Sequence, residues 1–238
     1  MKSGMDLLID GAQQLGIHLG EVEQEKFRLY EGLIEDWSKK INLVSYKSDE
    51  ELYRSHFLDS LMCSKGYNFS QDARIIDLGS GAGFPGVPLA ICFPNLKFWL
   101  VDSRNKRCDF LRRVNRELDL ESCCVIWERL ENIAHKKKYR GFFDCAVARA
   151  VAPLSVLLEL GLPFLKVQGK LIALKGYAVD EEIKESKNAL ETLGGNVDKV
   201  VPYFFPGEKG RNVVVVSKEE ETTLEFPRKP GIPAKKPL

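Results

Sequence analysis

Several features that would assign this chain to a protein class are scarce or missing from its 238 residues. Its six cysteines form no CxxC pair, and their spacing from the three histidines matches no zinc-site pattern. The 35 Lys and Arg nearly cancel the 34 Asp and Glu, so the overall charge gives no support to a nucleic-acid partner. We therefore predict no metal site, and any RNA-facing surface must come from local charge.

Long apolar runs are also missing. The opening residues MKSGMDLLIDGAQQL contain Asp6 and Asp10 where a secretion signal needs an unbroken apolar run, and no stretch of about 18 apolar residues occurs. We expect a cytoplasmic protein with reduced thiols and no membrane association.

Charge is nevertheless distributed unevenly along the chain. Residues 103–118 carry six Lys or Arg against Asp109 and Glu117, and the segment from Pro227 to Leu238 is basic throughout. Acidic residues gather in the N-terminal region, at Glu21, Glu23, Glu25, Glu31, Glu35 and Asp36. For the acidic cluster and for residues 103–118 there are two equal interpretations: a solvated helix face or part of an RNA-facing surface.

Hydrophobic periodicity divides the chain in two. Apolar residues at three- and four-residue steps over 21–41 and 49–63 predict amphipathic helices, so residues 1–65 are expected to form a helical cap. From residue 74, five short β-branched runs alternate with helical stretches, as in βαβ units with a parallel sheet. Two last runs joined by PGEKG predict an antiparallel hairpin.

The expected fold class is therefore α/β, with a Rossmann-like, seven-stranded and mostly parallel sheet. We predict a core over residues 66–218 and a basic, Pro-rich C-terminal tail over 219–238, all within one compact domain.

A glycine-rich turn follows the first predicted strand, in IIDLGSGAGFPGVPLA. Gly79, Gly81 and Gly83 allow tight turning and close approach of a ligand, because they have no Cβ. A dinucleotide fingerprint needs its third glycine at position 84, where this chain has Phe84. The turn therefore suits a cofactor without a pyrophosphate.

Two carboxylates accompany this turn. Asp77 precedes it, and Asp102 closes the second strand, 19 residues beyond Gly83, where a carboxylate can accept hydrogen bonds from both ribose hydroxyls of an adenosyl group. Helix or turn capping is the structural alternative for each. The combination favours a methyltransferase that uses S-adenosylmethionine.

Four segments make the chain resemble the RsmG family, also called GidB. They are WSKKINLVS with RSHFLDSL, DLGSGAGFPGVPL, LVDSRNKRCDFL, and FDCAVARAV with LIALKG, and the ending FPRKPGIPAKKPL is also similar. The resemblance implies methylation of N7 of guanine 527, in the 530 loop of 16S ribosomal RNA, with S-adenosylmethionine as cofactor. The implied partner is 16S rRNA or the assembling small ribosomal subunit, and we expect a monomer.

The resemblance also implies cofactor contacts at Gly79, Phe84, Leu130, Glu131 and Arg149. These residues follow predicted parallel strands, at whose carboxyl ends an open sheet leaves its binding crevice. With Asp77, Gly81, Gly83 and Asp102 they make up the expected cofactor site; for Leu130 and Glu131 an ordinary surface turn is the alternative.

Two cations stand at the ends of apolar strands, and burying such groups without a partner is costly. Arg149 and Lys175 are therefore predicted to position substrates, with a cofactor carboxylate, an RNA phosphate or a protein acid as possible partners. His56 and Asp59, three residues apart, are interpreted as structural rather than catalytic. Candidate RNA contacts are Lys106, Arg107, Arg129, Lys175, Arg211, Arg228 and Lys229.

The expected chemistry needs no general base, because guanine N7 already carries an available lone pair. This agrees with the lack of a Ser/His/Asp or Cys/His constellation in the sequence. A small-molecule methyltransferase, and a non-catalytic RNA- or ribosome-binding module on the same fold, remain the alternatives.

Overall fold

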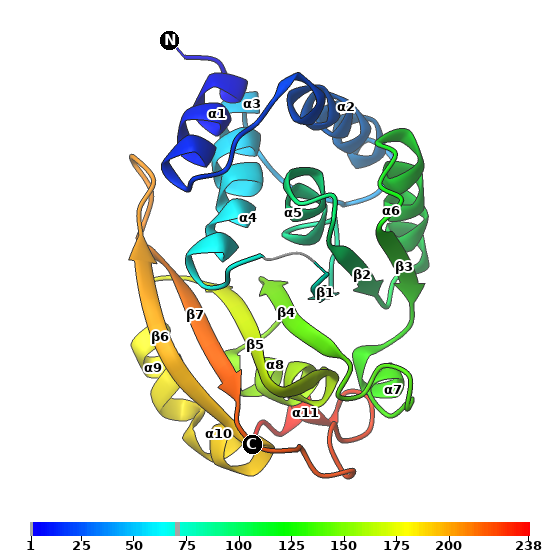
Figure 1. Cartoon of the computed structure of the whole chain (residues 1–238), viewed down its shortest axis with the longest axis vertical. Helices are drawn as coiled ribbons and strands as arrows, with labels where there is room; N and C mark the ends of the chain where they lie inside the picture. The colour runs from blue at the N-terminus through cyan, green and yellow to red at the C-terminus, as the bar shows by residue number, and fades with distance from the viewer. Residues whose placement is uncertain (1, 70–71) are drawn as a thin grey trace.

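A seven-stranded sheet organises the chain in the computed structural model, which describes residues 2–69 and 72–238 (Figure 1). The strand order is β3-β2-β1-β4-β5-β7-β6; β1 to β5 pair in parallel, and β7 is antiparallel to both of its neighbours. The strands are β1 (Arg74–Leu78), β2 (Lys97–Asp102), β3 (Cys123–Trp127), β4 (Phe143–Arg149), β5 (Leu165–Lys175), β6 (Gly195–Tyr203) and β7 (Arg211–Lys218). The predicted fold class is confirmed.

Helices cover both faces of this sheet because strands such as β1 and β4 are apolar on both sides. Two large apolar clusters result, one on each face. One face carries α5 (Gly86–Cys92) and α6 (Asn105–Glu117); the other carries α8 (Leu154–Gly161), η3 (Leu162–Phe164), α9 (Val179–Glu185) and α10 (Lys187–Leu193), while the short α7 (Leu130–Ile133) follows β3. Gly194 ends α10 with a φ of 73°, a conformation that favours glycine.

The N-terminal cap packs over α5 and α6 (Figure 1). It consists of α1 (Gly4–Gln14), α2 (Glu21–Ser38), α3 (Asp49–Leu52), the π-helical turn η1 (Tyr53–Leu58), α4 (Asp59–Leu61) and the 3-10 turn η2 (Met62–Lys65). Tyr30 stacks on Phe57 and donates its hydroxyl hydrogen to the carbonyl of Ala82 in the glycine-rich turn. The cap is thereby joined directly to the turn that the sequence singled out.

The C-terminal residues are packed against the core. After β7, Phe226 and Pro233 are buried, and α11 (Ile232–Lys235) lies against α8. Figure 1 shows this last segment, in red, passing beneath α7 and α8. The tail that composition marked as basic and Pro-rich thus has a defined place in the fold.

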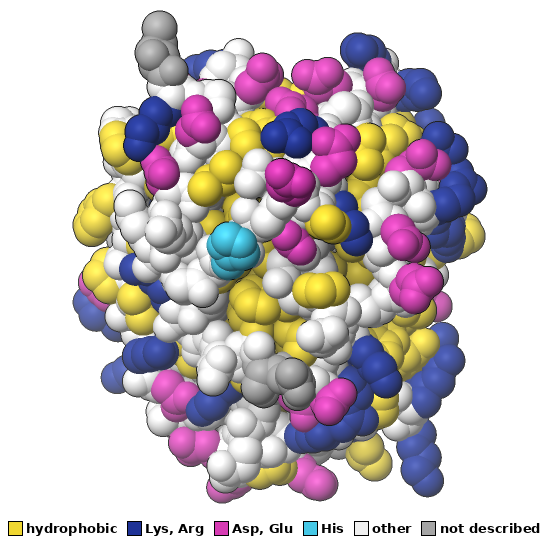
Figure 2. All heavy atoms as spheres, turned by 45° about the horizontal axis from the view of Figure 1, so that its top comes forward, with side chains coloured by type: hydrophobic (Ala, Val, Ile, Leu, Met, Phe, Trp, Pro, Cys, Tyr) yellow, Lys and Arg dark blue, Asp and Glu magenta, His cyan; other side chains and the backbone are white. Residues whose placement is uncertain are grey.

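Surface charge is polarised over the cap. Figure 2 shows acidic side chains scattered over the face that the cap helices form, and Lys and Arg gathered along the edge where α6 lies in Figure 1. Among the described residues, no helix combines the length and the hydropathy that crossing a bilayer requires.

Candidate functional site

The carboxyl ends of β1, β2 and β4 surround a cavity of about 460 Å³, which we call the loop cavity. The size falls within the range of small-molecule sites, roughly 300–1,000 Å³. Its walls combine polar and apolar side chains. Val151, Val156 and Leu160 contribute apolar surface, and the other lining residues include Gly79, Asp102, Arg107, Arg129, Leu130, Glu131, Ala150, Ala152, Pro233 and Ala234. It lies where an open α/β sheet places its ligands.

The glycine-rich turn forms one side of the loop cavity. Gly79 and Gly81 have φ angles of 70° and 58°, in the left-handed region that glycine adopts most readily. The amide of Gly81 donates to Asp102 Oδ2 at 3.0 Å, which ties the turn to the end of β2. The sequence pattern thus corresponds to a backbone that glycine forms without strain because it has no Cβ.

Asp102 occupies the centre of this cavity wall. Its other oxygen accepts from the amide of Arg104 at 2.8 Å, and the Arg107 guanidinium lies 3.5 Å from Oδ2. Asp102 therefore fixes the backbone just before α6, but the N-cap of this helix is Arg104, so the capping alternative for Asp102 is wrong. A carboxylate has about four lone-pair directions, so these contacts leave capacity for ribose hydroxyls.

Asp77 lies beneath the turn and is fully buried. Its Oδ2 accepts from the amide of Gly86 at 3.0 Å, while Oδ1 is buried with no hydrogen-bond partner among the described residues. Burial raises the pKa of Asp77 to about 7. The capping alternative is confirmed for Oδ2, and Oδ1 remains an acceptor for a donor or a cation.

A second cleft of about 690 Å³, which we call the cap cavity, opens between the cap and the ends of β4 and β5. It is lined by Ser55, His56 and Asp59 from the cap, by residues 149–153 after β4, and by Lys175, Glu182, Tyr203 and Arg211, among others. Ala150, Val151 and Ala152 belong to the walls of both cavities. The two cavities are therefore neighbours, separated by one short segment.

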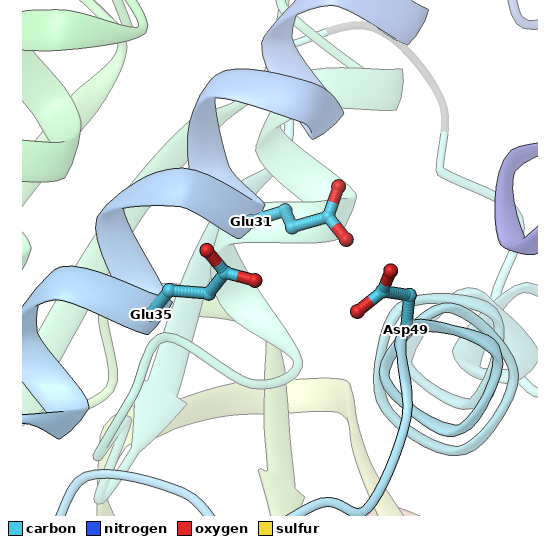
Figure 3. A group of neighbouring side chains, drawn as sticks. All are labelled: Glu31, Glu35 and Asp49. Carbon is cyan, nitrogen blue, oxygen red and sulfur yellow. The ribbon is translucent and has the colours of Figure 1, made fainter.

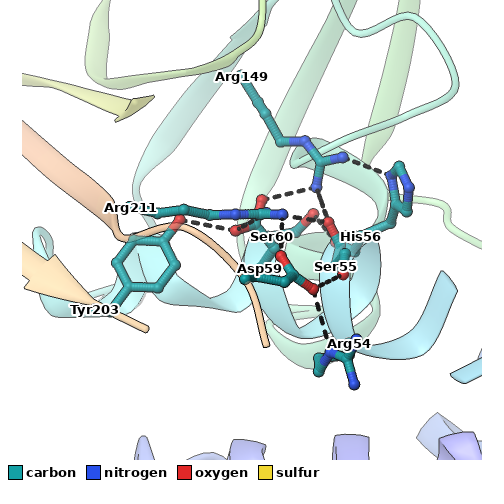
Figure 4. Close-up of polar contacts among 9 residues, drawn as sticks. Arg54, Ser55, His56, Asp59, Ser60, Arg149, Tyr203 and Arg211 are labelled. Atoms are coloured by element: carbon teal, nitrogen blue, oxygen red, sulfur yellow. Dashed lines mark hydrogen bonds and ion pairs between the residues drawn. The ribbon is translucent and has the colours of Figure 1, made fainter. Parts of the chain in front are cut away.

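Arg149 is the centre of the polar network in the cap cavity (Figure 4). Its Nη1 donates to Asp59 Oδ2 at 2.8 Å and to the carbonyl of Ser55 at 3.0 Å, and its Nη2 donates to His56 Nδ1 at 2.5 Å. Asp59 also pairs with Arg211 at 2.7 Å and accepts from the Tyr203 hydroxyl at 2.8 Å. Of the partners left open for Arg149, the structure supplies a protein acid.

Burial, together with the positive charge of Arg149, lowers the pKa of His56 to about 3. The ring is neutral at physiological pH and accepts a hydrogen bond through Nδ1. His56 and Asp59 thus belong to one structural network, joined through Arg149.

Lys175 also has a protein acid as its partner. Its Nζ lies 2.6 Å from Glu182 Oε2 and donates to the carbonyl of Ala152 at 2.7 Å. Glu182 also accepts from the amide of Leu154 at the start of α8. Glu182 could not be recognised from the sequence, because it lies on the polar face of α9 and its partners come from other elements.

Phe84 is buried against Tyr30, His56 and Phe57, and the Arg149 guanidinium lies 5.2 Å from its ring centroid. Any contact between Phe84 and a ligand in the loop cavity must therefore come from its backbone. A Cβ at position 83 would lie only 2.5–2.6 Å from the side chains of Tyr30 and Val87. Gly83 therefore allows the cap to pack closely against the turn.

The predicted RNA contacts are dispersed. Arg107 and Arg129 line the loop cavity, Arg211 lines the cap cavity, and Lys106 and Lys229 are exposed. Arg228 is paired with Glu159, whose side chain is fully buried, at 2.6 Å. The guanidinium of the half-buried Arg228 is thus engaged with a protein acid.

An acidic trio on the cap is separate from both cavities. Glu31, Glu35 and Asp49 point toward one another in Figure 3, and their carboxylate oxygens lie within 4.8 Å. Glu31 accepts from the Tyr53 hydroxyl at 2.7 Å, and burial raises the pKa of its carboxyl. Glu31 thus links α2 to the π-helical turn, whereas Glu35 and Asp49 are exposed, and exposed acids of this kind are common without an ion.

Comparison with known proteins shows the family of the chain. The family model described as "GidB: rRNA small subunit methyltransferase G" matches residues 23–211. The chain belongs to the GidB family. The match covers the cap from α2 onward, the whole parallel sheet and the first residue of β7.

Relatives in the same family align over nearly their full lengths. A protein of Alkaliphilus metalliredigens named ribosomal RNA small subunit methyltransferase G is 41% identical over 100% of both chains. One of the same name from Clostridium botulinum is 43% identical over 98% of both chains. Among solved structures, TYW2 of M. jannaschii in complex with AdoMet superposes with a TM-score of 0.52 at 15% identity, covering 68% of this chain and 74% of that one; this shows a shared fold.

S-adenosylmethionine is the cofactor of this methyltransferase, and the loop cavity fits it. Glycines with positive φ leave room where a Cβ would stand, Asp102 offers a carboxylate suited to ribose hydroxyls, and apolar side chains offer a surface for adenine. Asp77 does not line this cavity, and we expect the charge of its unpartnered Oδ1 to act on the cationic methionyl end from beneath the turn.

Asp77 leads to a testable pH dependence of cofactor affinity. The fold raises its pKa above the unfolded value, so deprotonation of Asp77 costs stability progressively between about pH 4 and pH 7. A cationic ligand favours the carboxylate, and binding then releases a proton below pH 7. We expect the Kd for S-adenosylmethionine to fall about tenfold between pH 6 and pH 8, measured by isothermal titration calorimetry.

Asp77→Asn provides the control for this effect, because it keeps the size of the side chain and cannot titrate. It should bind more weakly at pH 8 and show a flat affinity profile. An equally steep profile in Asp77→Asn would assign the pH dependence to another group.

Proposed function

We propose that this protein transfers a methyl group from S-adenosylmethionine to N7 of a guanine in 16S rRNA, guanine 527 by family resemblance. The observation that carries the proposal is the pair of adjacent cavities in a GidB-family chain. The loop cavity has the character of a nucleoside site, and the cap cavity is open and large enough for a nucleobase. We propose that methyl donor and acceptor meet at the wall that the two cavities share, residues 150–152.

The reaction needs alignment more than acid–base chemistry. S-adenosylmethionine supplies an electrophilic methyl group on a sulfonium. The N7 lone pair forms the new N–C bond as the C–S bond breaks, the electron pair passes to sulfur, and N7 has no proton to lose. Alignment of reacting atoms is worth up to roughly 7–11 kcal/mol in well-oriented systems.

The residues of the cap cavity supply that alignment. Arg149 joins the end of β4 to the cap, and Lys175 with Glu182 joins the end of β5 to residues 152 and 154. The shared wall is therefore held from both sides. Lys175 and Arg211 also line this cavity, where each is paired with a protein acid, Glu182 and Asp59 respectively. We propose that a nucleotide phosphate accepts hydrogen bonds from their remaining N–H groups.

Further RNA contacts are proposed at the exposed Lys106 and Lys229. Phosphate contacts make affinity fall with salt, by about 0.7–0.9 in logarithmic slope for each contact. We further propose that the protein acts as a monomer in the cytoplasm, on 16S rRNA or on the assembling small subunit.

Replacing His56 tests the absence of a general base. His56→Gln keeps a hydrogen-bond acceptor for Arg149, and we expect single-turnover methyl transfer to stay within about tenfold, equivalent to about 1.4 kcal/mol of barrier. The wild-type rate should also lack the pH dependence of a base with a near-neutral pKa, because the pKa of His56 is about 3.

A loss of several orders of magnitude in a folded His56→Gln enzyme that still binds cofactor and RNA would contradict this account. It would point to proton transfer and hence to a different acceptor atom.

A direct test supplies radiolabelled S-adenosylmethionine with small-subunit RNA or particles from cells that lack the gene, with large-subunit RNA as the control. We expect about one methyl group per small-subunit RNA and none above background in the control. Cofactor binding without transfer to either RNA would overturn the proposal and favour a non-catalytic module or a small-molecule acceptor.

A further inference from the structure

We propose that the C-terminal segment, Pro227–Leu238, forms part of the S-adenosylmethionine site and contributes to cofactor affinity. The inference rests on the cofactor of the proposed function and assigns this segment a role in ligand binding. Pro233 and Ala234, on α11, line the loop cavity together with Leu130 and Glu131. The segment is about 100 residues away from Glu131 in sequence, so its presence in this wall depends on specific docking.

Glu131 connects the segment to the cavity. Its Oε1 accepts from the backbone amide of Gly231 at 2.9 Å and from Arg129 Nη2 at 2.8 Å. Gly231 has a φ of 84°, and it is the residue immediately before α11. A carboxylate in the cavity wall therefore fixes the point at which the chain turns into the helix that carries Pro233 and Ala234.

A buried ion pair holds the start of the segment. Glu159, fully buried on α8, accepts from the Arg228 backbone amide at 2.7 Å and from its Nε and Nη2 at 2.9 and 2.6 Å. Nη2 of Arg228 also donates to the carbonyl of Lys236 at 2.8 Å. A buried carboxylate left without this partner would be strongly destabilising, so the docked position is specified by the core.

Arg140 holds the approach to the segment. Its guanidinium donates to the carbonyls of Thr222, Thr223 and Phe226, each at 2.8 Å. His135 bonds to the carbonyl of Pro227 at 2.8 Å. The side chains of Arg140, His135, Glu159 and Glu131 thus form hydrogen bonds, one after another, with the backbone between residues 222 and 231.

The arrangement gives the segment a chemical function. Pro233 and Ala234 add an apolar surface to a cavity whose other apolar side chains come from β2, α7, α8 and the 150–152 segment, and a planar adenine gains affinity from burial between such surfaces. Because Glu131 and α11 lie in one cavity wall, a cofactor that contacts this wall should stabilise the docked segment, and by linkage the docked segment stabilises the bound cofactor to the same extent.

A bulky residue in this wall tests the proposal in the full-length protein. Ala234→Trp should fill the cavity and raise the Kd for S-adenosylmethionine at least 30-fold in calorimetric titration. Lys235→Trp is the matched control: it adds the same side chain at the next, exposed position of α11, about 100° around the helix and outside the cavity wall, and should change the Kd less than threefold.

Hydrogen exchange of the wild-type protein supplies a second measurement that does not depend on the variant folding. S-adenosylmethionine should slow amide exchange at residues 229–236 as well as in the glycine-rich turn. Equal affinities in the two Trp variants, or protection confined to the turn, would overturn this inference. Failure of the wild-type protein to bind S-adenosylmethionine would instead overturn the proposed function.

Discussion

Arg149→Ala is expected to lower single-turnover methyl transfer at least 100-fold, equivalent to about 2.7 kcal/mol of barrier. The same change should lower the free energy of unfolding by about 3 kcal/mol, the lower end of the range for breaking a buried ion pair. Asp59 keeps Arg211 and the Tyr203 hydroxyl as partners, which limits the loss of stability. Rapid-quench transfer assays and urea denaturation measure the two effects.

The physical reason lies in what Arg149 joins. The guanidinium binds two carbonyls of the π-helical turn, at Ser55 and His56, together with Asp59 Oδ2, while its backbone begins the wall shared by the two cavities. π-helical turns are rare and frequently lie at functional sites. Without this side chain, the cap and the shared wall lose their common fixed point, and donor and acceptor lose their alignment.

Two further variants separate positioning from general instability. Arg149→Lys keeps the charge with fewer, differently directed donors and should recover only part of the rate. Arg74→Ala also removes a strand arginine that pairs with a carboxylate, Asp144, and lies over an aromatic ring, but at the opposite end of the sheet. Transfer by Arg149→Ala at the rate of Arg74→Ala would reject the positioning role.

Gly81→Val should raise the Kd for S-adenosylmethionine at least 100-fold while the protein remains folded. Gly81 has a φ of 58°, where a β-branched side chain is strained, and its amide binds Asp102 Oδ2. Valine should therefore both fill space at the turn and move Asp102, the carboxylate that we propose binds the ribose. Calorimetric titration gives the affinity, and circular dichroism checks the fold.

Gly16→Val is the matched control for backbone strain. Gly16 also has a left-handed φ, 73°, and nothing lies within 4 Å of an added Cβ, but it belongs to the cap rather than to the loop cavity. It should lose a similar increment of stability and bind the cofactor normally. Unchanged affinity in Gly81→Val would remove the turn from the cofactor site.

The sheet could be predicted from sequence because its signals are local. RIIDL and KFWLVD correspond to β1 and β2, and the hairpin expected around PGEKG is formed by β6 and β7. The glycine spacing at 79–83 likewise predicts the tight turn, and the carboxylates at 77 and 102 lie next to it in the structure. Each of these features depends on neighbours within about 25 residues.

The polar network could not be predicted because its contacts are distant in sequence. Asp59 and Arg149 are separated by 90 residues, and Arg228 and Glu159 by 69. Nothing periodic in the sequence relates such pairs. A cation in an apolar run needs a partner, because burying it unpaired is costly, and for Arg149 a ligand was one candidate. In the structure the partner is Asp59, a carboxylate of the cap.

The tail illustrates the same limit for charge. Its basic composition predicts phosphate contacts, yet Arg228 is bound to Glu159, a carboxylate on the otherwise apolar helix α8. Composition records how many charges a segment carries, and packing decides which of them face solvent. Lys229 is exposed and remains a proposed RNA contact.

The central claim is methylation of guanine N7 in 16S rRNA, and mapping N7-methylguanine in this RNA from cells with and without the gene tests it most directly. N7 methylation makes the nucleotide susceptible to chemical strand scission, so each site is read as a cleavage position. The account predicts one cleavage, at guanine 527 in the 530 loop, that disappears with the gene and returns with wild-type protein but not with Gly81→Val. An unchanged cleavage pattern in cells lacking the gene would contradict it.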